Sequence, residues 1–112
     1  MSDRELLEAA AKAAGMPHTY NEFWRGFYIR NPDGSWVPNH HWNPITDSGD
    51  AFELAVKLRL TVNCAYDEVA LCGQEFTQKE VFIERNGEDP LAATRRAIVR
   101  AAAAIGKEMK DD

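Results

Sequence analysis

The sequence has no long run of apolar residues. No stretch approaches the roughly 20 apolar residues that a membrane-spanning helix requires. The first five residues, MSDRE, are charged and do not follow the basic-then-apolar order of a secretory signal peptide. We therefore expect a cytoplasmic protein that does not act at a membrane.

Cysteine is scarce, with only Cys64 and Cys72 in the chain. Two cysteines do not form a disulfide framework, and we expect both to be reduced and to fill small buried positions on strands. A redox pair or a metal site remains an alternative for them. The sequence has no CxxC or HExxH motif, so we expect no metal and no cofactor.

The chain also lacks an excess of basic residues, and its formal net charge is −5. A protein that binds duplex nucleic acid needs a basic face, so we expect no such partner. The acidic residues favour solubility, although they could also imitate nucleic acid in a basic groove of another protein. No phosphate-binding glycine loop and no nucleophile elbow is present, so we expect no enzyme and no catalytic residues.

What the sequence does contain is enough apolar material for one core. Its hydrophobic fraction is 45%, with three Trp and five Phe, which is typical of a globular chain. The length of 112 residues indicates a single domain over 1–112. We expect only the charged tail 107–112 to fray.

Capping patterns predict three helices. Ser2 and Gly15 bound a helix over 2–14, and acids at Asp47 and Asp50 begin a second helix that runs to about Arg59. Asp89 caps the third, which covers 90–108. Their expected buried positions are Leu6, Leu7, Ala10 and Ala14; Ala51, Leu54, Ala55 and Leu58, widened by Phe52 and Val56; and Leu91, Ile98, Ala101, Ala102 and Ile105.

Strand signals lie between the helices. The segment 24–38 predicts a hairpin around the turn Asn31–Gly34, 61–72 predicts one bent strand or two short ones, and 80–85 predicts a further strand. The strand 80–85 is apolar on both faces, which predicts that other elements pack on both of its faces. The expected fold is therefore α+β, with a small antiparallel sheet of about four strands and three helices (α-β-β-α-β-β-α) as an α/β/α sandwich.

Two groups of residues are candidates for binding. The first is His40, His41 and Trp42, where adjacent histidines suggest a metal or a general base. We favour a structural interpretation, in which Trp42 packs on the sheet edge and the histidines flank it partly exposed. The segment lies between Pro38 and Pro44, so we expect neither helix nor central strand there.

The second group is Arg96 and Arg100, one helical turn apart on the same face. We favour a solvated face paired with acids such as Glu53 or Glu84. A contact patch for an acidic partner or a phosphate is the alternative. Arg95 should lie nearer the packed side of the helix.

Several segments resemble the phage ABA sandwich domain family of small bacteriophage and prophage proteins. They are Trp36-Val37-Pro38, then His41-Trp42-Asn43-Pro44, then ITDSGDAFELAVKL, and finally EDPLAATRRAIVRAAAAIG. The resemblance covers roughly residues 24–106. It implies a sheet between helical layers, and it brings no established activity or catalytic residues.

The function that we expect is therefore a non-enzymatic phage or prophage accessory protein in the bacterial cytoplasm. It would act by binding a host or phage protein, with host defence machinery among the candidates, and a homo-oligomer is compatible with this. The alternative is a module that binds a small ligand or nucleotide through Arg96, Arg100 and the Trp42 loop.

Overall fold

The computed structural model describes residues 2–66, 69–74 and 81–109. Within these residues the protein is α+β, with three helices and six strands. The elements are, in order, α1 (Asp3–Ala14), β1 (His18–Asn21), β2 (Gly26–Arg30), β3 (Trp36–Trp42), α2 (Ser48–Lys57), β4 (Leu60–Asn63), β5 (Val69–Gln74), β6 (Val81–Arg85) and α3 (Pro90–Glu108).

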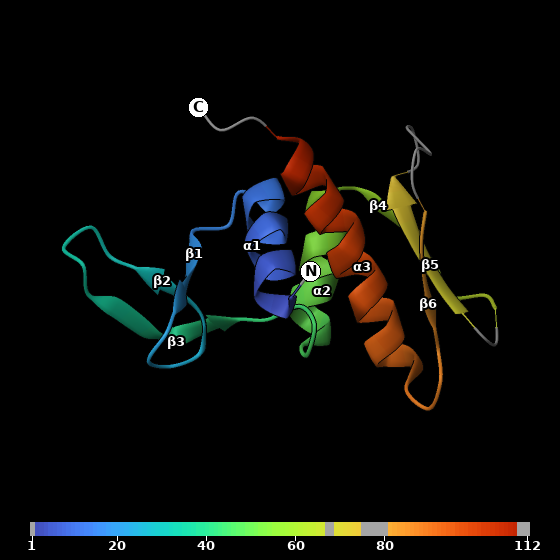
Figure 1. The fold of residues 1–112 in the computed structure, drawn as a ribbon, viewed down its shortest axis with the longest axis horizontal. Coiled ribbons are helices and arrows are strands. Elements are labelled where there is room, and N and C mark those ends of the chain that lie inside the picture. The colour runs from blue at the N-terminus through green and yellow to red at the C-terminus, as the bar shows by residue number, and fades with distance from the viewer. Residues whose placement is uncertain (1, 67–68, 75–80, 110–112) are drawn as a thin grey trace.

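The strands form two antiparallel sheets of three strands each, ordered β1-β2-β3 and β4-β5-β6. The three helices lie between the two sheets (Figure 1). The expected single sheet of about four strands is therefore wrong, and the arrangement differs from the expected α/β/α layering. The first sheet extends away from the helices as an arm (Figure 1), so that the molecule measures 47 × 33 × 23 Å.

All three helices begin where the sequence predicts. The side chains of Ser2, Asp47 and Asp89 each accept a hydrogen bond from the backbone N–H three residues later. Such caps satisfy amides that have no partner inside the helix. Gly15 ends α1 in the left-handed conformation, with φ of 66°, which glycine adopts without steric cost.

The first sheet contains the predicted hairpin and one strand that was not predicted. Strands β2 and β3 are joined through a turn in which Gly34 N–H donates to Asn31 O, and β1 pairs antiparallel with β2. β3 runs through Pro38, which an edge strand tolerates because proline has no N–H to donate and an edge strand does not need a donor at every position. The pairing of β3 with β2 is irregular there: Ile29 is opposite Val37, whereas Phe27 is opposite Trp42.

The second sheet packs on α3 with one face. The segment 61–72 contains two strands, β4 and β5, and the expected bend at Asp67-Glu68 lies outside the described residues. On β6, Phe82 contacts the core while Val81 and Ile83 remain more than half exposed. The expectation that this strand is covered on both faces is therefore wrong, because β-branched residues suit a strand even where nothing covers it.

The main core lies where α1, α2 and α3 meet. Ala97, Ala101 and Ala102 of α3 are buried, and small side chains allow neighbouring elements to approach closely. Gly106 shows how closely α3 approaches α1, because a Cβ placed there would collide with the backbone of Ala9.

The exposed side of α2 and the start of α3 differ from the expectation. Ala51, Leu54 and Ala55 are buried as predicted. Phe52, Val56 and Leu91, which were expected to be buried, are 71%, 59% and 67% exposed. An apolar residue next to the buried stripe of a helix is covered only if a further element reaches it, and among the described residues none does.

Candidate binding surface

The structure separates the two groups of candidate residues. His40, His41 and Trp42 end β3 in the arm, whereas Arg96 and Arg100 lie on α3. In Figure 1, α1 stands between β3 and α3. The two groups therefore lie on different parts of the fold, whereas the alternative function uses both.

Trp42 belongs to the core. Its ring is 3% exposed and packs edge-on against Phe27 with ring centroids 6.2 Å apart, and it stacks with His18 at 5.8 Å. The expected packing role of Trp42 is confirmed. His40 and His41 are both exposed, and strand alternation accounts for His41, which points to the face opposite Trp42.

His18 is the histidine that burial affects. It is partly buried, and desolvation lowers its pKa below the ordinary value of 6.5. A hydrogen bond with the backbone of His40 raises the pKa of His18, but desolvation is the larger effect. Burial therefore favours the neutral form of the ring, which stacks on Trp42, and its Nδ1 is buried without a hydrogen-bond partner among the described residues.

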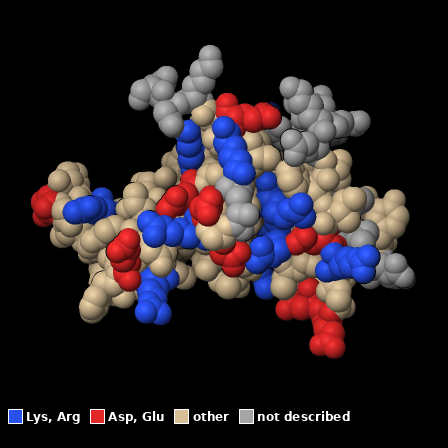
Figure 2. Space-filling model, viewed as in Figure 1, with Lys and Arg blue, Asp and Glu red and all other residues tan. Residues whose placement is uncertain are grey.

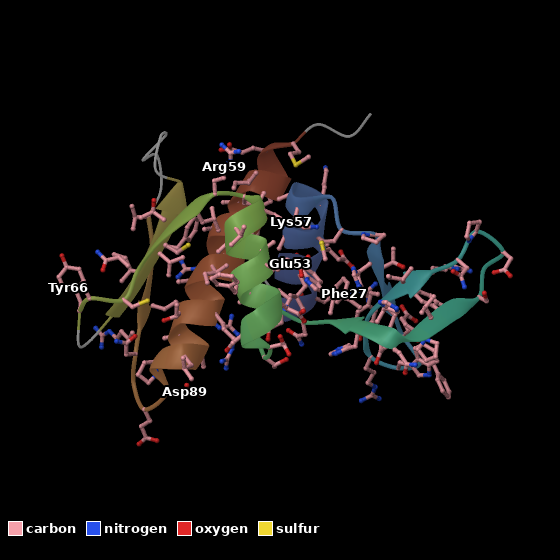
Figure 3. All side chains as sticks on the ribbon, turned by 180° about the vertical axis from the view of Figure 1, so that it is seen from behind. Phe27, Glu53, Lys57, Arg59, Tyr66 and Asp89 are labelled. Atoms are coloured by element: carbon pink, nitrogen blue, oxygen red, sulfur yellow. The ribbon has the colours of Figure 1, made fainter. Side chains whose placement is uncertain are left out.

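The outer face of the arm carries a row of aromatic rings. Trp24 meets Tyr28 edge-on at 4.8 Å, and Tyr28 meets His41 at 5.1 Å. The inner face of the same strands carries Phe27 (labelled in Figure 3) and Trp42. This alternation of strand residues sends one set of rings into the core and leaves the other on the surface.

The turn between β1 and β2 displays the most exposed aromatic side chain of the described residues, Phe23, which is 90% exposed. Asn21 is buried, and its side-chain oxygen accepts the N–H of Trp24 at 2.8 Å. Arg25 closes the turn at φ of 52°, a conformation that a non-glycine residue adopts at a cost. The turn is thus held in one shape while Phe23 points away from the protein.

Gly26 lets the turn approach the neighbouring strand. A Cβ at this position would lie 2.9 Å from atoms of the His41 ring, closer than ordinary van der Waals contact. The glycine therefore allows His41 to pack across β2 and complete the row of Trp24 and Tyr28.

Little in the sequence predicted this surface. His41 was a candidate, but Phe23 and Trp24 were not. Their exposure depends on the unpredicted strand β1, which turns the segment 22–25 into a tight connection. The consecutive Phe-Trp pair between Asn21 and Gly26 was the one available hint.

Arg96 and Arg100 lie beside acids, as the favoured interpretation expected. Arg100 contacts Glu84 at 2.9 Å and also donates to the carbonyl of Ile83. Arg96 contacts Asp3 at 3.1 Å and Glu84 at 3.9 Å. Glu84 was named among the expected partners, whereas Glu53 instead pairs with Lys57.

A cavity of about 580 Å³ adjoins these arginines between α1, α3 and β6, and Lys107 also lines it. Its positive charges already face Glu84 and Glu108 within the same lining. Figure 2 shows blue and red side chains interspersed over this part of the molecule. An anion entering the cavity would have to compete with these carboxylates.

Arg95 lies on the packed side, as predicted. Its Nε donates to the carbonyl of Ile45 at 2.7 Å and its Nη1 to Ser48 Oγ at 3.0 Å. These hydrogen bonds attach the loop that precedes α2 to helix α3, so the Arg95 side chain stabilises the fold.

The two cysteines have different environments. Cys72 is buried in the core, and desolvation raises its pKa to about 12, so its thiol is not reactive at neutral pH. Cys64 is exposed. Within the described part of the chain, no group of three or more His, Cys, Asp or Glu side chains is arranged to hold a metal ion.

Comparison with family models, with curated proteins and with solved structures finds no match to this chain. None of the helices over the described ranges is long and apolar enough to cross a lipid bilayer.

Proposed function

We propose that this protein works without catalysis, by binding another protein through the aromatic surface of its arm. The observation that carries the proposal is Phe23, a large apolar side chain 90% exposed on a turn that Asn21 holds in place. Aromatic side chains contribute much of the binding energy at protein interfaces. A turn that is ordered before binding loses less entropy when the partner arrives.

The chemistry of this surface indicates what kind of partner surface would fit it. Phe23 fits an apolar pocket, and the flatter row of Trp24, Tyr28 and His41 fits a broad apolar surface beside it. Arg25 is exposed and has no ion-pair partner among the described residues. An acidic group beside the pocket of the partner would pair with it.

The resemblance to the phage ABA sandwich domain family supports placing this protein among phage or prophage accessory proteins in the bacterial cytoplasm. On this proposal the partner is a host or phage protein, with host defence machinery the first class to examine. That resemblance implies a sandwich architecture, of which we retain only the coarser statement that this protein is a small α+β domain.

A photo-crosslinking aromatic amino acid in place of Phe23 tests the proposal in the bacterial host. We expect a covalent adduct with one protein. The matched control is the same substitution at Tyr66, an exposed aromatic residue in the connection between β4 and β5 (labelled in Figure 3), where no such adduct should form. Adducts with nucleic acid alone, or the same adducts from both positions, would contradict the proposal.

A second candidate function is the binding of a phosphorylated small ligand in the cavity beside Arg96 and Arg100. The size of the cavity, about 580 Å³, favours it, because ligand sites commonly measure about 300–1,000 Å³. A bound ligand would stabilise the folded state by mass action. At a hundredfold excess over Kd, the free energy of unfolding rises by about 2.7 kcal/mol, and the melting temperature rises with it. No shift with phosphate or with a nucleotide panel would exclude it.

A further inference from the structure

An apolar groove lies on the side of the molecule that carries α2. It has a volume of about 430 Å³ and lies between α2, α3 and β4. Small or buried side chains such as Ala51, Ala55 and Ile98 form its base. Figure 3 looks onto this side, with α2 in front.

Three large apolar side chains stand beside the groove instead of filling it. Phe52 and Val56 come from α2, one turn apart, and Leu91 comes from the first turn of α3. All three are more than half exposed. Contiguous exposed apolar side chains around a groove are typical of an interaction surface.

The charges at the two ends of α2 indicate what covers this surface. Arg59 follows the C-terminal end of α2, lines the groove and has no ion-pair partner among the residues that the structure describes. Asp47 caps the N-terminal end and is exposed. Among the described residues, α2 therefore has an unpaired cation at the end that adjoins the groove and an exposed carboxylate at its other end.

We infer that a second copy of this chain covers the groove, with α2 packed antiparallel on α2 of its partner about a two-fold axis. In this arrangement Phe52 of each copy lies beside Val56 of the other and enters the groove of the other. Arg59 of each copy then lies near Asp47 of the other, because 59 and 47 are nearly equidistant from the middle of α2. A two-fold interface requires such self-complementarity, since one patch must supply both halves of every contact.

This dimer is independent of the partner proposed for the arm. The arm lies at the end of the molecule away from the second sheet (Figure 1), and none of its residues lines the groove. A dimer would carry two arms, so that a partner with two sites would be held more tightly than by one arm alone.

Sedimentation velocity over about 1 μM to about 1 mM tests the inference. We expect the wild type to change from monomer to dimer over this range. Phe52→Glu should weaken the dimer at least about tenfold, and Phe23→Glu, which changes an exposed ring on the arm, should leave it unchanged. A wild type that stays monomeric throughout, or a dimer that survives Phe52→Glu, would overturn the inference.

A second pair of variants tests the antiparallel arrangement. Arg59→Glu should weaken the dimer about tenfold at low salt, whereas Arg85→Glu, an exposed charge reversal on β6, should not. Asp47→Asn removes the charge but keeps the helix cap, so it should weaken the dimer without lowering the melting temperature. If both changes at Arg59 and Asp47 leave the dimer Kd unchanged, the two-fold arrangement is wrong.

Discussion

At the scale of single residues, the structure separates side chains that hold the fold from neighbours of the same type that do not. Trp42 and Trp24 are both in the arm, yet Trp42 is buried against Phe27 while Trp24 lies on the surface. His18 is partly buried against Trp42, which lowers its pKa, whereas His40 and His41 are exposed. The burial of each side chain, and not its residue type, decides whether it holds the fold.

Replacing Trp42 should destabilise the protein strongly. Trp42→Ala removes a buried ring and should lower the free energy of unfolding by about 3 kcal/mol. His40→Ala, at an exposed position, should lower it by less than about 1 kcal/mol. Chemical denaturation measures both changes. A histidine variant less stable than the tryptophan variant would show that the histidines, and not Trp42, organise this segment.

Acid should weaken the fold through His18. Its pKa is lowered in the folded state, so below the ordinary value of 6.5 the unfolded chain binds a proton that the folded chain does not. The stability from this residue is therefore present above pH ~6.5 and is lost as the pH falls below it. His18→Phe keeps a ring on Trp42 but cannot titrate.

The measurement for His18 is the melting temperature of both proteins between pH ~7.5 and pH ~5. We expect the wild type to lose more stability over this range than His18→Phe. Identical pH profiles would mean that His18 does not titrate differently in the folded and unfolded chains.

At the scale of elements, the sequence predicted the starts of helices well and the packing of strands poorly. Ser2, Asp47 and Asp89 mark helix starts by local hydrogen bonds that depend on a few neighbouring residues. The division into two sheets depends on pairing between distant segments. The local sequence of His18–Asn21 does not predict a strand, because its residues show no apolar alternation.

The binding surfaces were harder still to predict. In the sequence, Phe52 and Leu91 look like buried residues because they are large and apolar. They are exposed because no element among the described residues covers them. Arg96 and Arg100 were predicted on one face, and the structure places both beside Glu84. A pattern along a helix identifies its faces, but the tertiary structure decides what each face meets.

Close packing of α1 on α3 reverses the usual effect of a glycine substitution. In an exposed helix, Gly→Ala is stabilising by up to about 1 kcal/mol. Gly106→Ala should instead lower the free energy of unfolding by about 1–3 kcal/mol, because the new methyl group meets the backbone of Ala9 and neither helix can move freely.

The control for Gly106 is Lys107→Ala, the next residue, which is exposed and should change stability by less than about 0.5 kcal/mol. Thermal and chemical denaturation compare the two. An unchanged or more stable Gly106→Ala variant would show that α1 and α3 are not packed as tightly as described.

At the scale of the whole molecule, the helices and the second sheet form a body from which the arm projects (Figure 1). Figure 2 shows charges of both signs interspersed over the face that it displays, so this face does not resemble the uniformly negative surface of a nucleic acid. Apolar side chains are exposed on the arm and beside α2, and these two surfaces are the ones that we propose for partners. We assign the first to another protein and the second to a second copy.

The central claim, that Phe23 on the arm anchors a protein partner, is tested most directly by the affinity for the protein crosslinked through position 23. Titration of that purified partner with wild type, Phe23→Ala and the control Tyr66→Ala gives three Kd values. We predict that Phe23→Ala weakens binding at least about thirtyfold, as loss of about 2 kcal/mol implies. Its melting temperature should not change, and Tyr66→Ala should bind like the wild type. Equal Kd values for wild type and Phe23→Ala would contradict the account.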